Sequence, residues 1–252
     1  MKMAHFVSVF VMFMVIAGAL EAQNQKVILT SLEWPPYTSE ALPDQGASSA
    51  VAVAAFKAMG YDLTIKFMPW ERAVDMAKND TSVMGYFPEY YSKDNATTFL
   101  YSDPMGQGPL GFVEPTGSPV KWSTLDDVKG LTIGVVEGYL NTDEFDARVV
   151  AHTQKVEAVS DDATNVAKVA AGRIPLAVID GNVLNYLVLK DKSVIPYRNQ
   201  VHFNGKILAN KSLYVCFKNT PDGQKLAKIY NAGLKKIDVS KIMTTLFYKL
   251  KD

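Results

Sequence analysis

The sequence contains few of the residues that metal centres and disulfide scaffolds need. Its 252 residues include a single cysteine, Cys216, and only three histidines. One cysteine cannot form an internal disulfide, and structural zinc sites use several cysteines or histidines at close spacing. We therefore expect neither a bound metal nor a cofactor, and we assign Cys216, which lies within an apolar run, to the core.

Excess charge of either sign is also absent, since 26 Lys and Arg residues balance 26 Asp and Glu residues. Nucleic-acid-binding proteins usually have a net positive charge, because contacts with phosphates supply most of their affinity. We therefore expect no nucleic-acid partner. Arginine, the side chain best suited to hold a carboxylate through two hydrogen bonds, occurs only at positions 72, 148, 173 and 198.

Motifs that carry catalysis are missing as well: the sequence has no phosphate-loop lysine motif, no His-Glu-x-x-His and no Gly-x-Ser-x-Gly. Glycines at 106, 108 and 111 have the spacing of a dinucleotide-binding loop, but Pro109 interrupts them and an extended segment follows where that motif needs a helix. These glycines fit a flexible crossover between two lobes better. We predict that the protein is not an enzyme.

Residues 1–22 have the pattern of a secretory signal peptide. Lys2 precedes an apolar run from Phe6 to Leu20, and Ala19 and Ala22 each fit the small residue before a cleavage site. The run is too short to span a membrane comfortably, and no later stretch of 18 or more apolar residues follows. The sequence therefore predicts export to the periplasm, with an N-terminal membrane anchor as the less favoured alternative.

Strand and helix patterns alternate after the signal peptide, which is typical of an α/β protein. The predicted strands are 27–32, 61–67, 81–87, 111–114, 131–136, 175–180 and 213–217, and the predicted helices are 49–59, 70–77, 142–151, 162–171, 182–190, 221–237 and 241–250. Two such blocks joined by two extended segments predict two lobes, 23–113 with 213–252 and 114–212. Ligands of such proteins favour the cleft between the lobes.

Four segments in a fixed order resemble the bacterial extracellular solute-binding proteins of family 3, the periplasmic components of ABC importers for polar amino acids. They are Trp34-Pro35-Pro36-Tyr37, Ser102-Asp103-Pro104, Leu125 through Gly138, and Ala171 through Asp180. The resemblance spans about residues 26–250. It implies the type II periplasmic-binding-protein fold, in which two α/β lobes joined by two crossing strands close on a ligand by a hinge.

The resemblance also implies binding residues. The family covers its ligand with an aromatic side chain after the first strand, and Trp34 or Tyr37 fits that place. It binds the ligand's ammonium group with an aspartate at the end of a lobe 2 strand, which corresponds to Asp180. Asp180 has a structural alternative as the N-cap of the helix that follows.

Two groups with which the family holds a ligand's carboxylate are missing. Tyr90 or Asn95, depending on the alignment, replaces the clamping arginine, and Tyr139 stands where a Ser or Thr hydroxyl is expected. Neither Tyr90 nor Asn95 can form a two-bond pair with a carboxylate. The departures predict a small polar or cationic, amino-acid-like solute that differs from a standard amino acid.

Other side chains complete the predicted ligand site. Arg72, at the start of a helix, or Lys93 could replace the missing clamp, with a solvated surface position as the alternative for both. The remaining candidates share an aromatic ring, which attracts cations but also favours the core: Trp70, Tyr86, Tyr90 and Tyr139.

We therefore predict a monomeric periplasmic solute-binding protein that serves an ABC permease. Two alternatives stay open. One is an exported enzyme that resembles cyclohexadienyl dehydratase, with Glu33, Glu89, Glu114 or Glu137 as the proton donor. The other is a sensory adaptor whose closed form docks on a membrane receptor.

Overall fold

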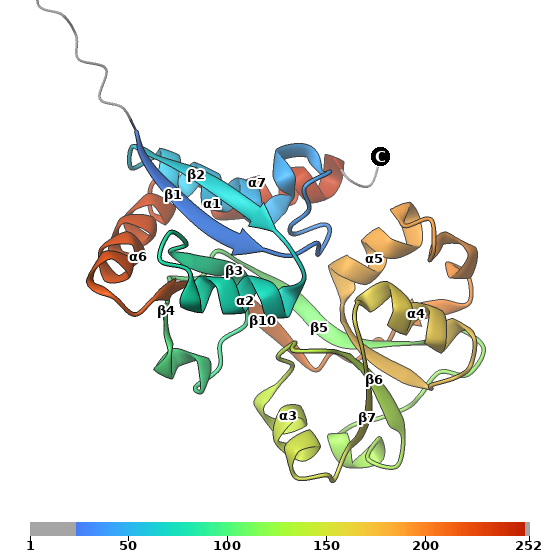
Figure 1. Ribbon diagram of the computed structural model, residues 1–252. Coiled ribbons are helices and arrows are strands. Elements are labelled where there is room, and N and C mark those ends of the chain that lie inside the picture. The colour runs from blue at the N-terminus through green and yellow to red at the C-terminus, as the bar shows by residue number, and fades with distance from the viewer. Residues whose placement is uncertain (1–23, 250–252) are drawn as a thin grey trace, which may run out of the picture.

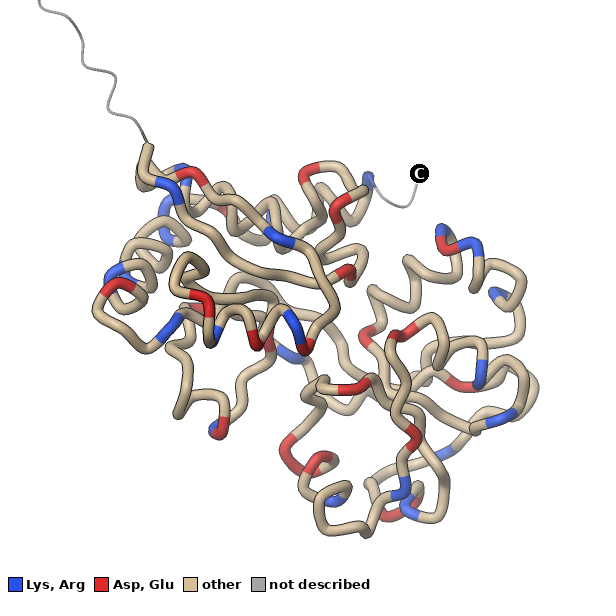
Figure 2. The backbone as a smooth tube through the Cα atoms, in the orientation of Figure 1, with Lys and Arg blue, Asp and Glu red and all other residues tan. Residues whose placement is uncertain are grey.

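Two α/β lobes make up the part of the chain that the structure, a computed structural model, describes, residues 24–249 (Figure 1). This architecture confirms the predicted fold class. The predicted signal peptide lies outside the described residues. None of the helices between residues 24 and 249 has the length and apolar character of a membrane span. Figure 2 shows Lys and Arg interspersed with Asp and Glu along both lobes.

Lobe 1 is a sheet with helices on both faces. Its strands, in sheet order, are β2 (Tyr61–Phe67), β1 (Gln25–Ser31), β3 (Gly85–Glu89) and the second half of β10 (Ala209–Lys218), with β4 (Phe99–Tyr101) also paired to β10. Its helices are α1 (Ala47–Lys57), α2 (Trp70–Asn79), α6 (Pro221–Leu234) and α7 (Val239–Lys249).

Alternation along β1 explains why helices cover both faces of this sheet. Leu29 packs in the main core together with Phe56 of α1, whereas Ile28 packs in a smaller core together with Ala77 of α2. Successive strand side chains point to opposite faces, so α1 and α2 cover different sides. Because β1 and β3 are parallel, their carboxyl ends meet at the same edge of the sheet.

Lobe 2 repeats this arrangement with fewer helices. Its strands are β5 (Gly106–Pro115), β8 (Leu176–Asp180), β6 (Thr132–Val136) and β7 (Lys155–Val159) in sheet order, with β9 (Val201–Phe203) paired to β5. Its helices are α3 (Asp143–Val150), α4 (Asp162–Ala170) and α5 (Gly181–Lys190). The last strand residue, Asp180, is also the N-cap of α5, so β8 leads directly into a helix at the edge that faces lobe 1 (Figure 1).

The antiparallel strands β5 and β10 connect the lobes. Residues 209–213 of β10 pair with β5, whereas Tyr214, Cys216 and Phe217 pair with β3; the register of this second pairing shifts between Tyr214 and Cys216. One strand therefore belongs to the sheets of both lobes. The predicted lobe limits, 113/114 and 212/213, fall within β5 and β10 themselves.

The structure differs from the sequence prediction at short strands. β4, β7 and β9 were not predicted, and β3 begins at Gly85 instead of residue 81. An Asx turn explains the late start of β3, because Asp80 Oδ1 accepts a hydrogen bond of 2.8 Å from the Ser82 amide and holds that stretch in a turn. Cys216 lies in the core, as predicted, and is fully buried.

Candidate functional site

The loop after β1 brings two of the predicted aromatic residues together. A backbone bridge between Trp34 and Thr38 closes the loop. The rings of Trp34 and Tyr37 stack within it, with centroids 4.5 Å apart and an interplanar angle of 21°. Both side chains are buried, and both make polar contacts with lobe 2.

Tyr37 contacts Asp180 across the cleft. Its hydroxyl lies 3.1 Å from both carboxylate oxygens of Asp180 and accepts a hydrogen bond of 2.8 Å from the Asn182 side chain. Asp180 also accepts hydrogen bonds from the Asn182 and Val183 amides, as the N-cap of α5. Asp180, which the resemblance predicts to bind a ligand's ammonium group, therefore lies against a phenol of the chain itself.

Trp34 makes a second contact across the cleft. Its indole nitrogen donates to Asp162 Oδ2 at 3.2 Å. Asp162 is the first residue of α4, and Asp161 before it caps that helix by accepting a hydrogen bond from the Thr164 amide. Asp162 is only 8% exposed. Its other oxygen, Oδ1, accepts no hydrogen bond from residues 24–249.

The end of β3 contributes Glu89, which is 5% exposed. Its carboxylate accepts hydrogen bonds from the Tyr90 amide at 2.8 Å, from the Tyr86 hydroxyl at 3.1 Å and from the Asn95 side chain at 3.1 Å. Both residues that could align with the family's arginine, Tyr90 and Asn95, therefore lie next to a carboxyl group. Tyr86 lies deeper, in the smaller core of lobe 1.

Trp70 and Tyr139 close the remaining side of the cleft. The indole nitrogen of Trp70, at the start of α2, donates to the Gly138 carbonyl of lobe 2 at 3.2 Å. The Tyr139 ring lies edge-on to both Trp34 and Trp70, with centroids 6.5 Å and 6.1 Å away. Six of the predicted site residues therefore meet between the lobes: Trp34, Tyr37, Trp70, Tyr90, Tyr139 and Asp180.

Two hollows flank this aromatic cluster, and Trp34 and Tyr139 line both. We name the first the inner cavity; it has a volume of about 30 Å³ and is lined by Leu32, Trp34, Trp70, Pro88, Glu89, Tyr90, Tyr139, Leu140 and Leu213. The second, the outer groove, has a volume of about 670 Å³, and its lining includes Glu33, Trp34, Tyr139, Asp161, Asp162, Tyr186, Lys190 and Lys192. The inner cavity has room for a water molecule or two, so a larger ligand requires the lobes to open.

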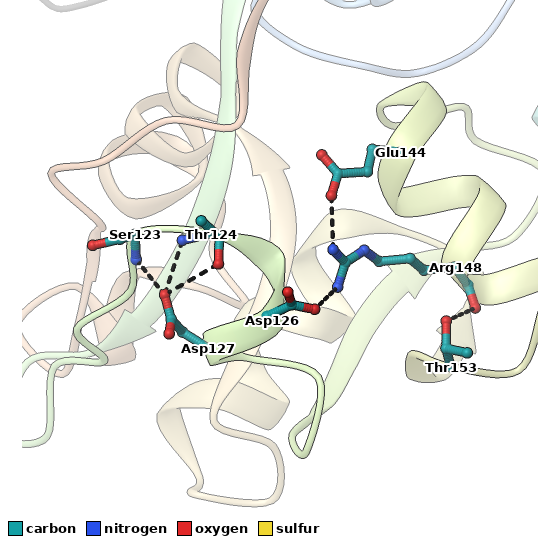
Figure 3. A network of polar contacts seen from close by, with 7 residues as sticks. All are labelled: Ser123, Thr124, Asp126, Asp127, Glu144, Arg148 and Thr153. Carbon is teal, nitrogen blue, oxygen red and sulfur yellow. Dashed lines mark hydrogen bonds and ion pairs between the residues drawn. The ribbon is translucent and has the colours of Figure 1, made fainter.

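The arginines lie away from this site. Arg72, a predicted site residue, is on the exposed side of α2 and lines neither hollow, and Lys93 is exposed too. Arg148 forms ion pairs of 2.8 Å with Asp126 and Glu144 in lobe 2 (Figure 3). Arg173 and Arg198 are exposed. In this conformation, the structure therefore does not support the prediction that Arg72 replaces the family's carboxylate-binding arginine.

Burial determines the protonation of the three carboxyl groups. Burial raises the pKa of Glu89 to about 8 and the pKa values of Asp162 and Asp180 to about 7. Hydrogen bonds to the carboxylates act in the opposite direction, and the charge of Lys211 also lowers the pKa of Glu89. The Lys211 ammonium lies 5.0 Å from the centre of the Tyr90 ring. Acidic groups with such perturbed pKa values are typical of functional sites.

Two buried acids of the site were missed as ligand groups by the sequence analysis. Asp162 was not singled out, and Glu89 was named only as a proton donor for the alternative enzyme. The pair Asp161-Asp162 before a predicted helix was a readable capping signal, yet only the fold reveals that Asp162 turns toward Trp34. No cluster of His, Cys, Asp or Glu suited to a metal ion occurs within residues 24–249.

No family model and no curated protein match the chain. Solved structures, however, match most of it. A histidine kinase sensor domain with similarity to periplasmic binding proteins has a TM-score of 0.74 and 14% identity, over 90% of this chain and 96% of that one. The amino acid ABC transporter substrate-binding protein AbpA from Streptococcus pneumoniae, bound to L-arginine, has a TM-score of 0.72 and 12% identity, over 90% and 96%.

A third matching structure bears on the alternative that the protein is an enzyme. The ancestral amino-acid-binding protein AncCDT-1, a precursor of cyclohexadienyl dehydratase, has a TM-score of 0.67 and 14% identity, over 90% of this chain and 95% of that one. At these identities the matches establish the fold. The chain has the two-lobed fold of the periplasmic binding proteins, and its aromatic and acidic cluster lies between the lobes.

Proposed function

We propose that this protein is a periplasmic solute-binding protein, which captures a small polar or cationic, amino-acid-like solute between its lobes without transforming it. The observation that carries the proposal is the set of contacts across the cleft, Tyr37 with Asp180, Trp34 with Asp162, and Trp70 with the Gly138 carbonyl. Each contact joins one lobe to the other, so a solute that inserts there changes the balance between open and closed forms.

Delivery to an ABC permease is the downstream step that we favour. The similarity to AbpA supports it, and the predicted signal peptide would place the protein in the periplasm. We expect the protein to act there as a monomer. The similarity to a histidine kinase sensor domain supports a sensory adaptor as the alternative. Uptake of labelled solute by cells with and without the gene separates the two, because only a transport component changes the uptake rate.

Binding itself is tested by a thermal-shift screen over amino acids, amines, betaines and small carboxylates. A solute at a hundredfold its dissociation constant stabilises the native state by about 2.7 kcal/mol, which gives a clear rise in melting temperature. A hit should also change the intrinsic tryptophan fluorescence. If no member of a broad panel changes either signal, the proposed function is wrong.

Glu89 favours the enzyme as the second candidate. It lines the inner cavity, and with a pKa of about 8 it is mostly protonated at neutral pH, as a general acid must be. The similarity to AncCDT-1 points the same way. Formation of product from prephenate or arogenate, lost in Glu89→Gln, would support this candidate over simple binding.

A further inference from the structure

Three buried carboxyl groups of the cleft accept hydrogen bonds only from neutral donors: Glu89 at the inner cavity, Asp162 at the outer groove and Asp180 at the contact with Tyr37. Glu89 accepts from an amide, a phenol and a carboxamide, and Asp162 accepts from an indole. Asp180 accepts from a phenol and two backbone amides. Within residues 24–249, no Lys or Arg forms an ion pair with any of the three.

Cationic groups that could bind a carboxylate are few at the cleft: Lys211 lies over the Tyr90 ring, and no arginine lines either hollow. The four arginines are exposed or ion-paired elsewhere. The N-termini of α4 and α5, which would otherwise offer free amides to an anion, are capped by Asp161 and Asp180. An anionic group at these helix ends would meet two aspartates.

The Tyr90 hydroxyl is an independent indication of a ligand site. Tyr90 lines the inner cavity and is 7% exposed, yet its buried hydroxyl has no hydrogen-bond partner among residues 24–249. A buried hydroxyl without a hydrogen-bond partner is unfavourable for the folded state. The Tyr90 ring lies edge-on to Trp34, with centroids 6.2 Å apart, so Tyr90 belongs to the aromatic cluster between the lobes.

Asp162 supplies the complementary group. Its Oδ2 is held by Trp34, while Oδ1 is free to accept a hydrogen bond at the outer groove. The rings of Trp34 and Tyr139, which separate the two hollows, present π faces and edges within 6.5 Å of each other. A cation at Asp162, beside these two rings, gains both from the carboxylate and from cation–π attraction.

We infer that the cleft takes an organic amine that has no carboxylate group, with its ammonium at the Asp162 carboxylate in the outer groove and a second hydrogen-bond donor at the Tyr90 hydroxyl in the inner cavity. This inference rests on the proposed function and specifies its solute class. Lys190 and Lys192 also line the outer groove, but both are exposed. An exposed ion pair contributes little, so they do not select for a carboxylate.

Pairs of compounds that differ only by a carboxylate test the inference directly. Isothermal titration of the purified full chain uses agmatine against L-arginine and cadaverine against L-lysine. We expect at least one amine to bind tenfold or more tightly than its parent amino acid. If the amino acids bind as tightly as the amines or more tightly, the inference is wrong and the proposed function stands. If neither the amines nor the amino acids bind, and no compound of the wider panel binds either, the inference and the proposed function are both wrong.

Variants of the chain test the position of the ammonium group. Asp162→Asn keeps an acceptor for the Trp34 indole but removes the negative charge, and we expect it to weaken amine binding at least tenfold. Asp126→Asn is the matched control, since it removes one charge from the distant Arg148 network (Figure 3), and it should bind like the wild type. Tyr90→Phe should weaken binding severalfold. Unchanged binding in both Asp162→Asn and Tyr90→Phe would overturn the inference.

Discussion

The hydroxyl of Tyr90 makes opposite contributions to stability and to binding, because it is buried and has no hydrogen-bond partner in the described part of the chain. Tyr90→Phe removes this unpaired group and retains the ring against Trp34. We expect the free energy of unfolding of the ligand-free protein to rise by about 1 kcal/mol, measured by urea denaturation. Tyr86→Phe is the control, since it breaks hydrogen bonds to Glu89 and Asn95 and should lower stability. A loss of stability in Tyr90→Phe would show that the hydroxyl is paired in solution.

The three buried carboxyl groups make stability depend on pH. Their pKa values in the folded protein, about 7 for Asp162 and Asp180 and about 8 for Glu89, exceed those of the unfolded chain. The folded state therefore binds more protons between about pH 4 and pH 8. Stability contributed by these groups is full below pH 4 and is lost as the pH rises through 7 to 8.

The melting temperature of the ligand-free protein should accordingly fall between pH 5 and pH 8.5, as scanning calorimetry can measure. Each proton fully released on unfolding changes the free energy by about 1.4 kcal/mol per pH unit. Asp162→Asn should flatten the profile, whereas Asp126→Asn, at an exposed position, should leave it unchanged. A melting temperature that rises over this range would contradict the assignment.

Individual residues of the site were predictable where a local motif marks them. Trp34 and Tyr37 follow the first strand and Asp180 ends a strand of lobe 2, and the structure brings all three to the cleft. Arg72 stands at the start of a helix as predicted, but the rotation of α2 leaves its side chain exposed. The burial of Glu89 depends on packing that no local pattern encodes.

At the level of elements, Gly108 in β5 sets how closely the crossing strand approaches the cleft. A Cβ atom there would lie 2.0 Å from Asp180 Oδ2 and 2.1 Å from the Tyr37 hydroxyl. Gly108→Ala should therefore push these two groups apart and favour the open form. We expect a lower melting temperature and a larger radius of gyration by small-angle scattering.

Gly117→Ala is the matched control for this substitution, because nothing lies within 4 Å of its added Cβ. The control should change neither the melting temperature nor the radius of gyration by a measurable amount. If Gly108→Ala behaves like Gly117→Ala, the contact between Tyr37 and Asp180 does not hold the lobes together.

Helices and long strands were predictable, and short strands were not. α4 and α5 were predicted to within a residue or two, because apolar periodicity and capping aspartates are local signals. β9 has only three residues, and its partner Val113 lies 90 positions earlier in the chain. Such a strand is specified by its pairing with β5, which no window of neighbouring residues contains.

At the scale of the whole molecule, the tryptophans report on different places. Trp34 and Trp70 each donate a hydrogen bond across the cleft, whereas Trp122 donates to Asn204 within lobe 2. We expect a bound solute to change the fluorescence of Trp122→Phe as much as that of the wild type, and the change to be reduced in Trp34→Phe. Fluorescence titration measures both. A signal that depends on Trp122 would place the conformational change outside the cleft.

Both β1 and α7 belong to lobe 1, so lobe 2 is inserted between the two crossing strands and is attached to lobe 1 through β5 and β10 (Figure 1). A tether at either end of the described chain therefore immobilises the same lobe and leaves the other free to swing. Because the cysteine is buried, a thiol dye on a new cysteine at the exposed Val150 position of α3 would label the moving part selectively. With lobe 1 tethered and a dye on lobe 2, a change in dye fluorescence would report movement of lobe 2 relative to lobe 1.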